Sequence, residues 1–289
     1  MELALQMAVN ATALAAVYAL FGLSFSFIYA ATGIMHFAHG ATFTVAAYLF
    51  YLLYTLLDAP LVPAAAGAVV GAALFGWAVM RGFYQPLQRL GASPALVMIA
   101  SLGLFIVIDN LIVLVFGADS RVADKGGVAS GMLLGPVYIT PLQLWTVAVA
   151  VLAVGGTALL LTRTRLGQAI RGMSDDPGFA AIIGIDIGRL GGIVFALGSA
   201  LLALGAVVVS LDIGVSPGAS LRVVLIAAVA SILGGTATIY GGLAGGVIVA
   251  LLESGGGLAV DPRWQNVIVF GALIAVLLVR PAGLFARIR

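Results

Sequence analysis

The sequence predicts an all-α, polytopic integral membrane protein with about eight transmembrane helices, within a range of about seven to nine. Hydrophobic residues make up 63% of the 289 residues and charged residues only 8%, whereas soluble domains carry about 25% charged residues. The apolar residues gather into runs of about 20, the length needed to cross a hydrocarbon core about 30 Å thick. The 38 glycines favour close helix packing in lipid. We therefore interpret residues 1–289 as one transmembrane domain.

The composition also limits the chemistry. The chain has no cysteine and two histidines, which excludes disulfides and thiol catalysis and leaves a zinc site possible only with carboxylate ligands. Its one lysine, Lys125, is not part of a GxxxxGK[ST] phosphate loop. No spacing supports a Ser-His-Asp triad or paired catalytic carboxylates. We expect no enzyme activity, cofactor, metal site or nucleic-acid partner for this chain.

The first apolar run covers residues 8–30. No lysine or arginine precedes Arg81, so the start lacks the basic region of a cleavable signal peptide. The first run is therefore expected to remain in the mature protein.

The second run, roughly 34–57, begins with HFAHG at His36–Gly40. Two histidines three residues apart share a helix face if the segment is helical, and polar groups near the membrane need partners. Gly33 and Gly40 bracket the histidines, so the backbone could break there. Three interpretations stay open. The segment is a structural or gating element at a helix break, which is favoured, or a metal site or proton relay, which is less favoured. Otherwise the histidines lie at the inner interface, where they snorkel or bond neighbouring carbonyls.

The third and fourth runs cover 61–83 and 94–117. Asp109 and Asn110 lie well inside the fourth run, and an acid within the membrane is a candidate functional group. Its position in the outer third favours a simpler interpretation, in which Asn110, a helix end or water satisfies Asp109.

A mixed-charge, glycine-rich loop, 118–140, follows, and we interpret it as an outer cap or docking surface. The fifth run, 141–162, leads into residues 163–190, the only long polar segment. Arg163 to Arg171 is predicted to continue the fifth run as a basic helix. Ser174, Asp175 and Asp176 are good N-caps, and Pro177 suits a first helical turn.

The next residues, Phe179, Ala180, Ile182 and Ile183, predict a short apolar helix that ends at Gly184. Such a helix is unstable in water unless something covers it. A cytosolic partner protein is favoured over the membrane interface as that cover.

The remaining runs are 191–211, 221–253 and 264–280. Nine of the thirteen basic residues lie in the loop after residue 80, in 163–190 and in the C-terminal tail, which places these segments in the cytoplasm. The N-terminus is then outside and the C-terminus inside. Run 221–253 must consequently begin and end outside, with glycines at its centre.

This run predicts two short or tilted helices or a re-entrant hairpin. Irregular backbone at membrane depth requires cover by protein or a water-filled cavity. A pathway lining and a tightly packed glycine seam are equally favoured. Glu253 and Ser254 are interpreted as an outer helix terminus or a vestibule edge.

Several of these stretches, in this order along the chain, resemble the permeases of branched-chain amino-acid ABC importers, the LivH-type subunit. The matching residues are Asp176, Ala180 and Gly184 to Asp186 after Arg163 and Ala169 to Arg171, HFAHG at His36–Gly40, SLGLFIVIDN at Ser101–Asn110, FALGSALLALGA at Phe195–Ala206, GGLAGG at Gly241–Gly246, and LLVRPAGLF at Leu277–Phe285. Two departures are Gly178, where the family often has Glu, and Asp109, where it often has Gln.

The resemblance implies a multi-pass protein of the bacterial inner membrane, with a periplasmic N-terminus and a cytoplasmic C-terminus. It implies a second, LivM-type permease, two ABC ATPase subunits and a periplasmic solute-binding protein as partners, and alternating access driven by ATP hydrolysed on the partner chains. The residues expected to couple to the ATPase are Arg171, Asp175, Asp176, Phe179, Ala180, Ile183 and Gly184. The residues expected in the pathway or gate are Phe37, Ala38, His39, Gly40, Asn110, Gly234 and Gly235.

Three alternatives remain at this point. A permease for urea or short-chain amides differs only in its cargo. A proton- or sodium-coupled secondary carrier would use Asp109 and Glu253 for coupling. A membrane scaffold would show no dependence on substrate.

Overall fold

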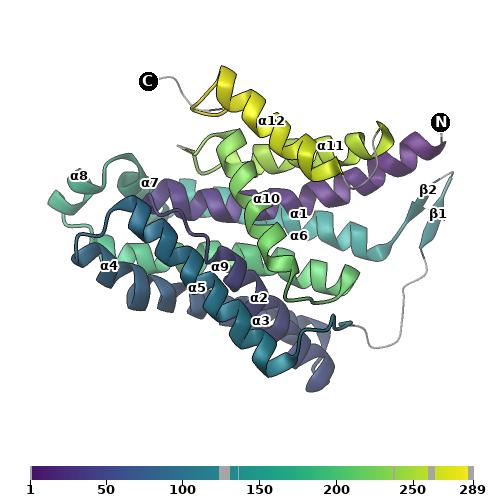
Figure 1. The fold of residues 1–289 in the computed structure, drawn as a ribbon, viewed down its shortest axis with the longest axis horizontal. Helices are drawn as coiled ribbons and strands as arrows, with labels where there is room; N and C mark the ends of the chain where they lie inside the picture. The colour runs from purple at the N-terminus through teal and green to yellow at the C-terminus, as the bar shows by residue number, and fades with distance from the viewer. Residues whose placement is uncertain (1, 124–130, 136, 237, 260–263, 286–289) are drawn as a thin grey trace.

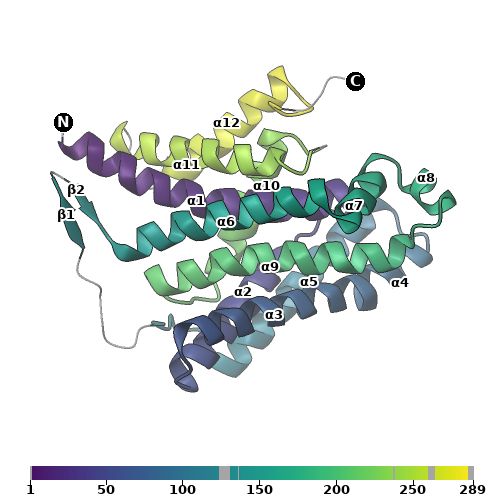
Figure 2. The ribbon, with the colours of Figure 1, turned by 180° about the vertical axis from the view of Figure 1, so that it is seen from behind.

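The computed structural model describes residues 2–123, 131–135, 137–236, 238–259 and 264–285, and these residues form a helical bundle with one small β-hairpin (Figures 1 and 2). The elements in chain order are α1 (Glu2–Thr32), α2 (His39–Tyr51) with a π-helical segment (Leu52–Leu56), α3 (Leu61–Val79) with a π-helical segment (Met80–Tyr84), α4 (Gln85–Arg89), α5 (Pro94–Phe116), β1 (Met132–Leu134), β2 (Val137–Ile139), α6 (Pro141–Arg163), α7 (Arg165–Asp175), α8 (Pro177–Ile182), α9 (Ile187–Ile213), α10 (Ala219–Gly234), α11 (Gly241–Ala259) and α12 (Gln265–Val279).

Five of these helical stretches in the described part are long and apolar enough to cross a membrane. They are α1, the stretch from α3 to α4, α5, α6 and α9; α10, α11 and α12 are apolar but shorter. The fold class is therefore confirmed. The helix of the second run begins at His39 rather than at residue 34, because residues 33–38 are not helical.

Local sequence signals define where several long helices begin and end. Ser93 caps α5 by accepting a hydrogen bond from the Leu96 N–H, with Pro94 in the first turn. Thr140 and Gln143 form a reciprocal capping box at the start of α6. Gly117 ends α5 with φ +88°, a left-handed conformation that glycine adopts without a Cβ penalty.

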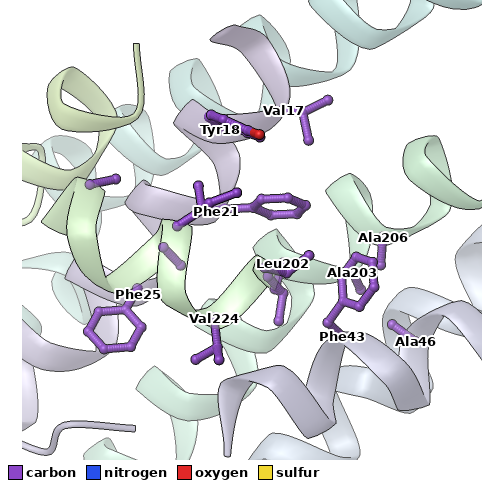
Figure 3. Packing of buried hydrophobic residues seen from close by; sticks show 14 of the residues in the cluster. Val17, Tyr18, Phe21, Phe25, Phe43, Ala46, Leu202, Ala203, Ala206 and Val224 are labelled. Atoms are coloured by element: carbon purple, nitrogen blue, oxygen red, sulfur yellow. The ribbon is translucent and has the colours of Figure 1, made fainter. Parts of the chain in front are cut away.

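The centre of the bundle is α1. It packs against α9, α10 and α11, and most of its length is buried, whereas α5 and α6 lie at the edge with most of their surface exposed. Figure 3 shows the core at this centre, where Phe21 of α1 meets Leu202 and Ala203 of α9 and Val224 of α10. The Phe21 ring also packs edge to face against Phe43 of α2, with ring centroids 5.8 Å apart.

The two ends of the bundle differ in charge. Helices α4, α7 and α8 gather at one end, which we call the basic end, and β1, β2 and the N-terminus lie at the other, the β1–β2 end (Figures 1 and 2). The basic end carries Arg81, Arg89, Arg163, Arg165, Arg171 and Arg189. At the β1–β2 end, the side chain of Gln6 makes two hydrogen bonds to the backbone of Tyr138, of 2.8 and 2.9 Å. The described part of the loop predicted as an outer cap thus holds the start of α1 through β1 and β2, and residues 124–130 and 136 of that loop lie outside the described residues.

Candidate functional site

The polar segment 163–190 forms two helices, α7 and α8, that project at the basic end. The prediction that Arg163–Arg171 continues the preceding helix is wrong. Helix α6 stops at Arg163, and Thr164, in an extended conformation, caps a new helix by accepting a hydrogen bond from the Gly167 N–H at 2.9 Å. Gly167 lies directly against the backbone of Leu160 and Leu161, so α7 folds tightly back on the last turn of α6.

Helix α8 has the predicted capping pattern. Asp176 accepts a hydrogen bond from the Phe179 N–H at 2.9 Å, and Pro177 occupies the first turn. After α8, Gly184 turns the chain with φ +92°. Because α8 has only six residues, its conformation depends on these caps and on the neighbours it packs against.

The exposed face of α8 is apolar. Phe179 is 61% exposed, Ile182 83% and Ile183 60%, whereas Ala180 is buried with 1% exposure. Ala180 therefore faces the protein and cannot offer its side chain to a partner. Ile182 was absent from the predicted coupling residues, although its spacing of three from Phe179 on a helix places both on one face. Arg171 and Asp175 of α7 and Asp176, the N-cap of α8, are also exposed.

Helix α7 connects this exposed face to the centre of the bundle. Its apolar side, with Ile170 and Met173, is buried among residues of α1 and α9. The Ser174 hydroxyl donates a 2.7 Å hydrogen bond to the carbonyl of Ala30 in the last turn of α1. A displacement of α8 would consequently reach α1 through α7.

The HFAHG segment lies where the chain breaks between α1 and α2. His36 and His39 are both buried, with 1% and 0% exposure, and their rings are 5.3 Å apart. Their partners are hydroxyl groups, since His36 Nδ1 lies 2.8 Å from the Tyr84 oxygen and His39 Nε2 lies 2.9 Å from Ser24 Oγ. The interpretation in which the histidine rings bond neighbouring carbonyls is therefore wrong.

A chain of hydrogen bonds ties this break to neighbouring helices. The Tyr84 hydroxyl is 2.6 Å from Ser101 Oγ of α5, and Ser101 Oγ accepts a hydrogen bond from the Ala38 N–H at 2.9 Å. Gly40 packs so closely on Phe105 of α5 that an added Cβ would lie 2.8 Å from its ring. The segment is a hydrogen-bonded junction of α2, α5 and the π-helical segment that holds Tyr84.

Replacing Tyr84 with phenylalanine should destabilise the protein by about 2 kcal/mol, because buried polar groups that lose a partner cost about 1–3 kcal/mol each. The substitution removes the oxygen that His36 and Ser101 share. Thermal unfolding in detergent measures the change. Tyr138→Phe is the matched control, since Tyr138 is 61% exposed, and an equal loss in both variants would contradict the expectation.

Asp109 and Asn110 point in different directions. Asp109 Oδ1 accepts hydrogen bonds of 2.9 Å from Thr44 of α2 and from Ser220 of α10. Asn110 is exposed on α5 and donates to the carbonyl of Ile106, one turn earlier. Asp109 Oδ1 is therefore bonded by hydroxyls of two other helices, and the Asn110 amide bonds elsewhere.

Run 221–253 forms an antiparallel pair, with α10 running one way and α11 running back. Arg222 at the start of α10 meets Glu253 late in α11, and Gly234 lies against Gly241 at the turn. The run therefore begins and ends on the same side, as the charge pattern predicted. The C-terminal tail covers the turn, since the N–H groups of Leu284 and Phe285 donate to the carbonyls of Leu233 and Gly234.

Glycines make the contacts of this pair with each other and with α1. A Cβ added at Gly242 would meet the carbonyl of Gly22, and one added at Gly245 would meet that of Ala230. Gly235 turns the chain with φ +113° and lies against Gly283. The half of the pair nearest the turn is thus a glycine seam, and the predicted gate residues Gly234 and Gly235 are packed within it.

The other half of the pair lines a cavity of about 810 Å³ near the β1–β2 end, between α1, α6, α9, α10 and α11. Arg222 and Glu253 form an ion pair in its wall, with Nη2 and Oε1 2.5 Å apart, and the Tyr18 hydroxyl donates to Glu253 Oε2 at 2.8 Å. Sequence reasoning assigned no role to Arg222 and interpreted Glu253 as an outer helix terminus or a vestibule edge. Glu253 lies within α11 and lines the cavity.

The predicted pathway residues therefore do not form one site. Phe37 to Gly40 belong to the junction at the start of α2, Asn110 lies on the exposed face of α5, and Gly234 and Gly235 lie at the α10–α11 turn. None of them lines the cavity. Among the described residues, no group of three or more His, Asp or Glu side chains is placed to hold a metal ion.

Comparison with known proteins gives consistent results over nearly the whole chain. Residues 7–277 match the sequence model of a family described as branched-chain amino acid transport system, permease component. The high-affinity branched-chain amino acid transport permease BraD of Pseudomonas aeruginosa is 29% identical, covering 98% of this chain and 96% of its own length. The corresponding LivH protein of Escherichia coli K12 is 28% identical with the same coverage. A probable LivH permease of Methanocaldococcus jannaschii is 26% identical over 92% of this chain. No solved structure matches the chain.

Proposed function

The chain belongs to the family of branched-chain amino-acid transport permeases, and from this premise we propose a specific role for it. It is the membrane-spanning permease subunit of an ABC importer for branched-chain amino acids, in the bacterial inner membrane. It works with a second, LivM-type permease, two ATPase subunits and a periplasmic solute-binding protein. ATP is hydrolysed on the partner chains, and this subunit moves substrate by alternating access.

The observation that carries the proposal is the apolar face of α8 at the basic end. Three large apolar side chains, Phe179, Ile182 and Ile183, are exposed together in a region of the chain rich in arginine. A cluster of this kind on a short capped helix is stable in water only if a partner covers it. Basic loops face the cytoplasm, so the partner proposed here is the cytoplasmic ATPase.

This orientation also assigns the ends of the molecule. The N-terminus and the β1–β2 end face the periplasm, where a binding protein releases substrate, and the C-terminus faces the cytoplasm. A push on α8 passes through α7 to the end of α1 by the Ser174–Ala30 hydrogen bond. Since α1 packs along α9, α10 and α11, a movement of α1 would change how these helices are positioned around the cavity.

Uptake by the assembled transporter in proteoliposomes tests the proposal. We expect uptake of labelled leucine that needs the binding protein and internal ATP and that continues when an uncoupler removes the proton gradient. Uptake of urea or acetamide in place of leucine would assign the chain to an amide permease. Uptake that stops with the uncoupler and needs no ATPase would identify an ion-coupled carrier, and no uptake at all would indicate a scaffold.

Replacing Asp109 with asparagine separates the ATP-driven from the ion-coupled mechanism within this chain. We expect leucine uptake to stay within about twofold of the wild type, because the Asn oxygen still accepts the hydrogen bonds of Thr44 and Ser220. Asp109→Leu removes that acceptor and should lower stability by about 1–3 kcal/mol. An ion-coupled carrier would instead lose uptake with Asp109→Asn, which initial-rate measurements would reveal.

A further inference from the structure

We propose that the cavity near the β1–β2 end binds an α-amino acid as its zwitterion, with the α-carboxylate on Arg222 and the α-ammonium between Glu253 and Asp212. This inference rests on the proposed function and names the place where this subunit itself holds substrate. The cavity, at about 810 Å³, is within the range of about 300–1,000 Å³ that small-molecule sites occupy.

The exposure of the two paired side chains indicates which atoms a ligand can reach. The Glu253 side chain is 10% exposed, whereas the Arg222 side chain is 55% exposed. Both Glu253 oxygens are engaged, one by Arg222 and one by the Tyr18 hydroxyl. A guanidinium has five N–H donors in a planar fork, so Arg222, which lines the cavity, has donors beyond the one that Glu253 accepts, and a carboxylate could use them.

In the structure the ion pair neutralises both charges. The Glu253 side chain is nearly buried, and removing one partner of such a pair leaves the other unsatisfied. A zwitterion brings one charge of each sign, so it can insert between the pair and leave both partners paired.

The acidic residues of the wall favour an ammonium group on the ligand. The titratable groups that line the cavity are Arg222, Glu253, Asp212 and Tyr18. Asp212, in the last turn of α9, is exposed, and it adds a second carboxylate to a lining that has one guanidinium. An anion without an ammonium group would face two acids and one base, and we expect it to bind weakly.

The rest of the wall fits an aliphatic side chain. Apolar residues from α1, α9 and α10 line it: Leu14, Val17, Phe21, Val209, Val223 and Ile226. Tyr18 and Phe21 of α1 appear side by side in Figure 3, where Tyr18 carries the hydroxyl oxygen and Phe21 belongs to the apolar core. A polar end formed by the ion pair and an apolar remainder together match a branched or aliphatic amino acid.

Ligand binding would act on the α10–α11 pair, because Arg222 lies on α10 and Glu253 on α11. Separating these two side chains breaks the ion pair that joins the helices at the cavity, whereas the glycine seam near the turn keeps the helices in contact. The cavity is thus placed to transmit the presence of substrate to a helix pair that packs along α1.

Saturation-transfer NMR on the assembled transporter in nanodiscs, without the binding protein, tests the assignment of the two charges. We expect L-leucine to bind at least about tenfold more tightly than L-leucinamide, which lacks the carboxylate, and than 4-methylpentanoate, which lacks the ammonium. In Arg222→Gln the difference between leucine and leucinamide should disappear. Equal binding of all three probes to the wild type, or an unchanged preference in Arg222→Gln, would overturn the inference.

A charge swap separates ligand binding from structure. The double variant Arg222→Glu with Glu253→Arg restores an ion pair, so thermal stability should return, but the exchanged charges should leave leucine uptake at least about tenfold below wild type. Full recovery of uptake would assign the pair to structure alone. Arg121→Gln, at the same end but outside the cavity lining, is the control with normal uptake. If the wild-type transporter does not import leucine, the proposed function fails. If the wild-type transporter imports leucine and the Arg222 and Glu253 variants import it equally well, only the cavity inference fails.

Discussion

Replacing Ile182 with aspartate should uncouple ATP hydrolysis from transport and lower leucine uptake by about thirtyfold, the effect of losing about 2 kcal/mol at a central interface residue. Ile182 is 83% exposed on α8, so the change removes little from the packing of this chain itself. It places a charge in the apolar face that the ATPase is proposed to cover, and burying an unpaired charge is unfavourable. Phe179→Asp and Ile183→Asp should act in the same direction.

Two measurements make this result specific. The amount of permease in the membrane and its thermal unfolding should match wild type, since surface substitutions away from packed features usually change stability by less than about 0.5 kcal/mol. Leu90→Asp is the matched control, because Leu90 is also 83% exposed and follows α4 at the same end. Normal uptake and normal stimulation of the ATPase by the binding protein in Ile182→Asp would show that α8 is not the coupling element.

The broad architecture could be predicted because it depends on local and additive properties of the chain. Apolar runs of about 20 residues identify spans wherever they occur, and the charge asymmetry of loops predicts orientation. That logic indicated that run 221–253 returns to its starting side, and the contacts of Arg222 with Glu253 and of Gly234 with Gly241 agree with it. The capping of α8 by Asp176 could be predicted for the same reason, since a cap lies within a few residues of what it caps.

The sequence-based predictions failed, or were missing, where distant or competing interactions decide the structure. Thr164 competes with helix continuation by capping the next helix, so α6 and α7 separate although the sequence between them is compatible with a helix. The partners of Asp109 lie 65 and 111 residues away in Thr44 and Ser220. The ion pair in the cavity joins residues 31 apart. A single sequence contains no signal for such pairings beyond the cost of leaving each group alone.

The helix pair α10–α11 is attached to α1 at positions where only glycine fits, and we expect Gly242→Leu to be the most destabilising substitution in this region. A Cβ at Gly242 would meet both the carbonyl of Gly22 and the hydroxyl of Ser26, and a Cβ at Gly22 would meet the carbonyl of Gly242. Overpacking a core costs about 1–3 kcal/mol, occasionally more. Because backbone atoms cannot rotate away as side chains do, we expect at least about 3 kcal/mol here. Thermal unfolding of the purified protein should show this loss together with a lower yield of monodisperse transporter.

Gly155→Leu is the matched control, because Gly155 lies inside α6 and nothing lies within 4 Å of its added Cβ. It should unfold at nearly the wild-type temperature, since leucine is also the better helix former. The reciprocal variant Gly22→Leu should resemble Gly242→Leu, and the double variant should lose less than the sum of both, because one separation of the two helices relieves both collisions. Additive losses would mean that the two glycines do not share one contact. A stable Gly242→Leu protein would mean that α11 does not approach α1 through its glycines, and the route from α8 through α1 to the cavity would then lack its last step.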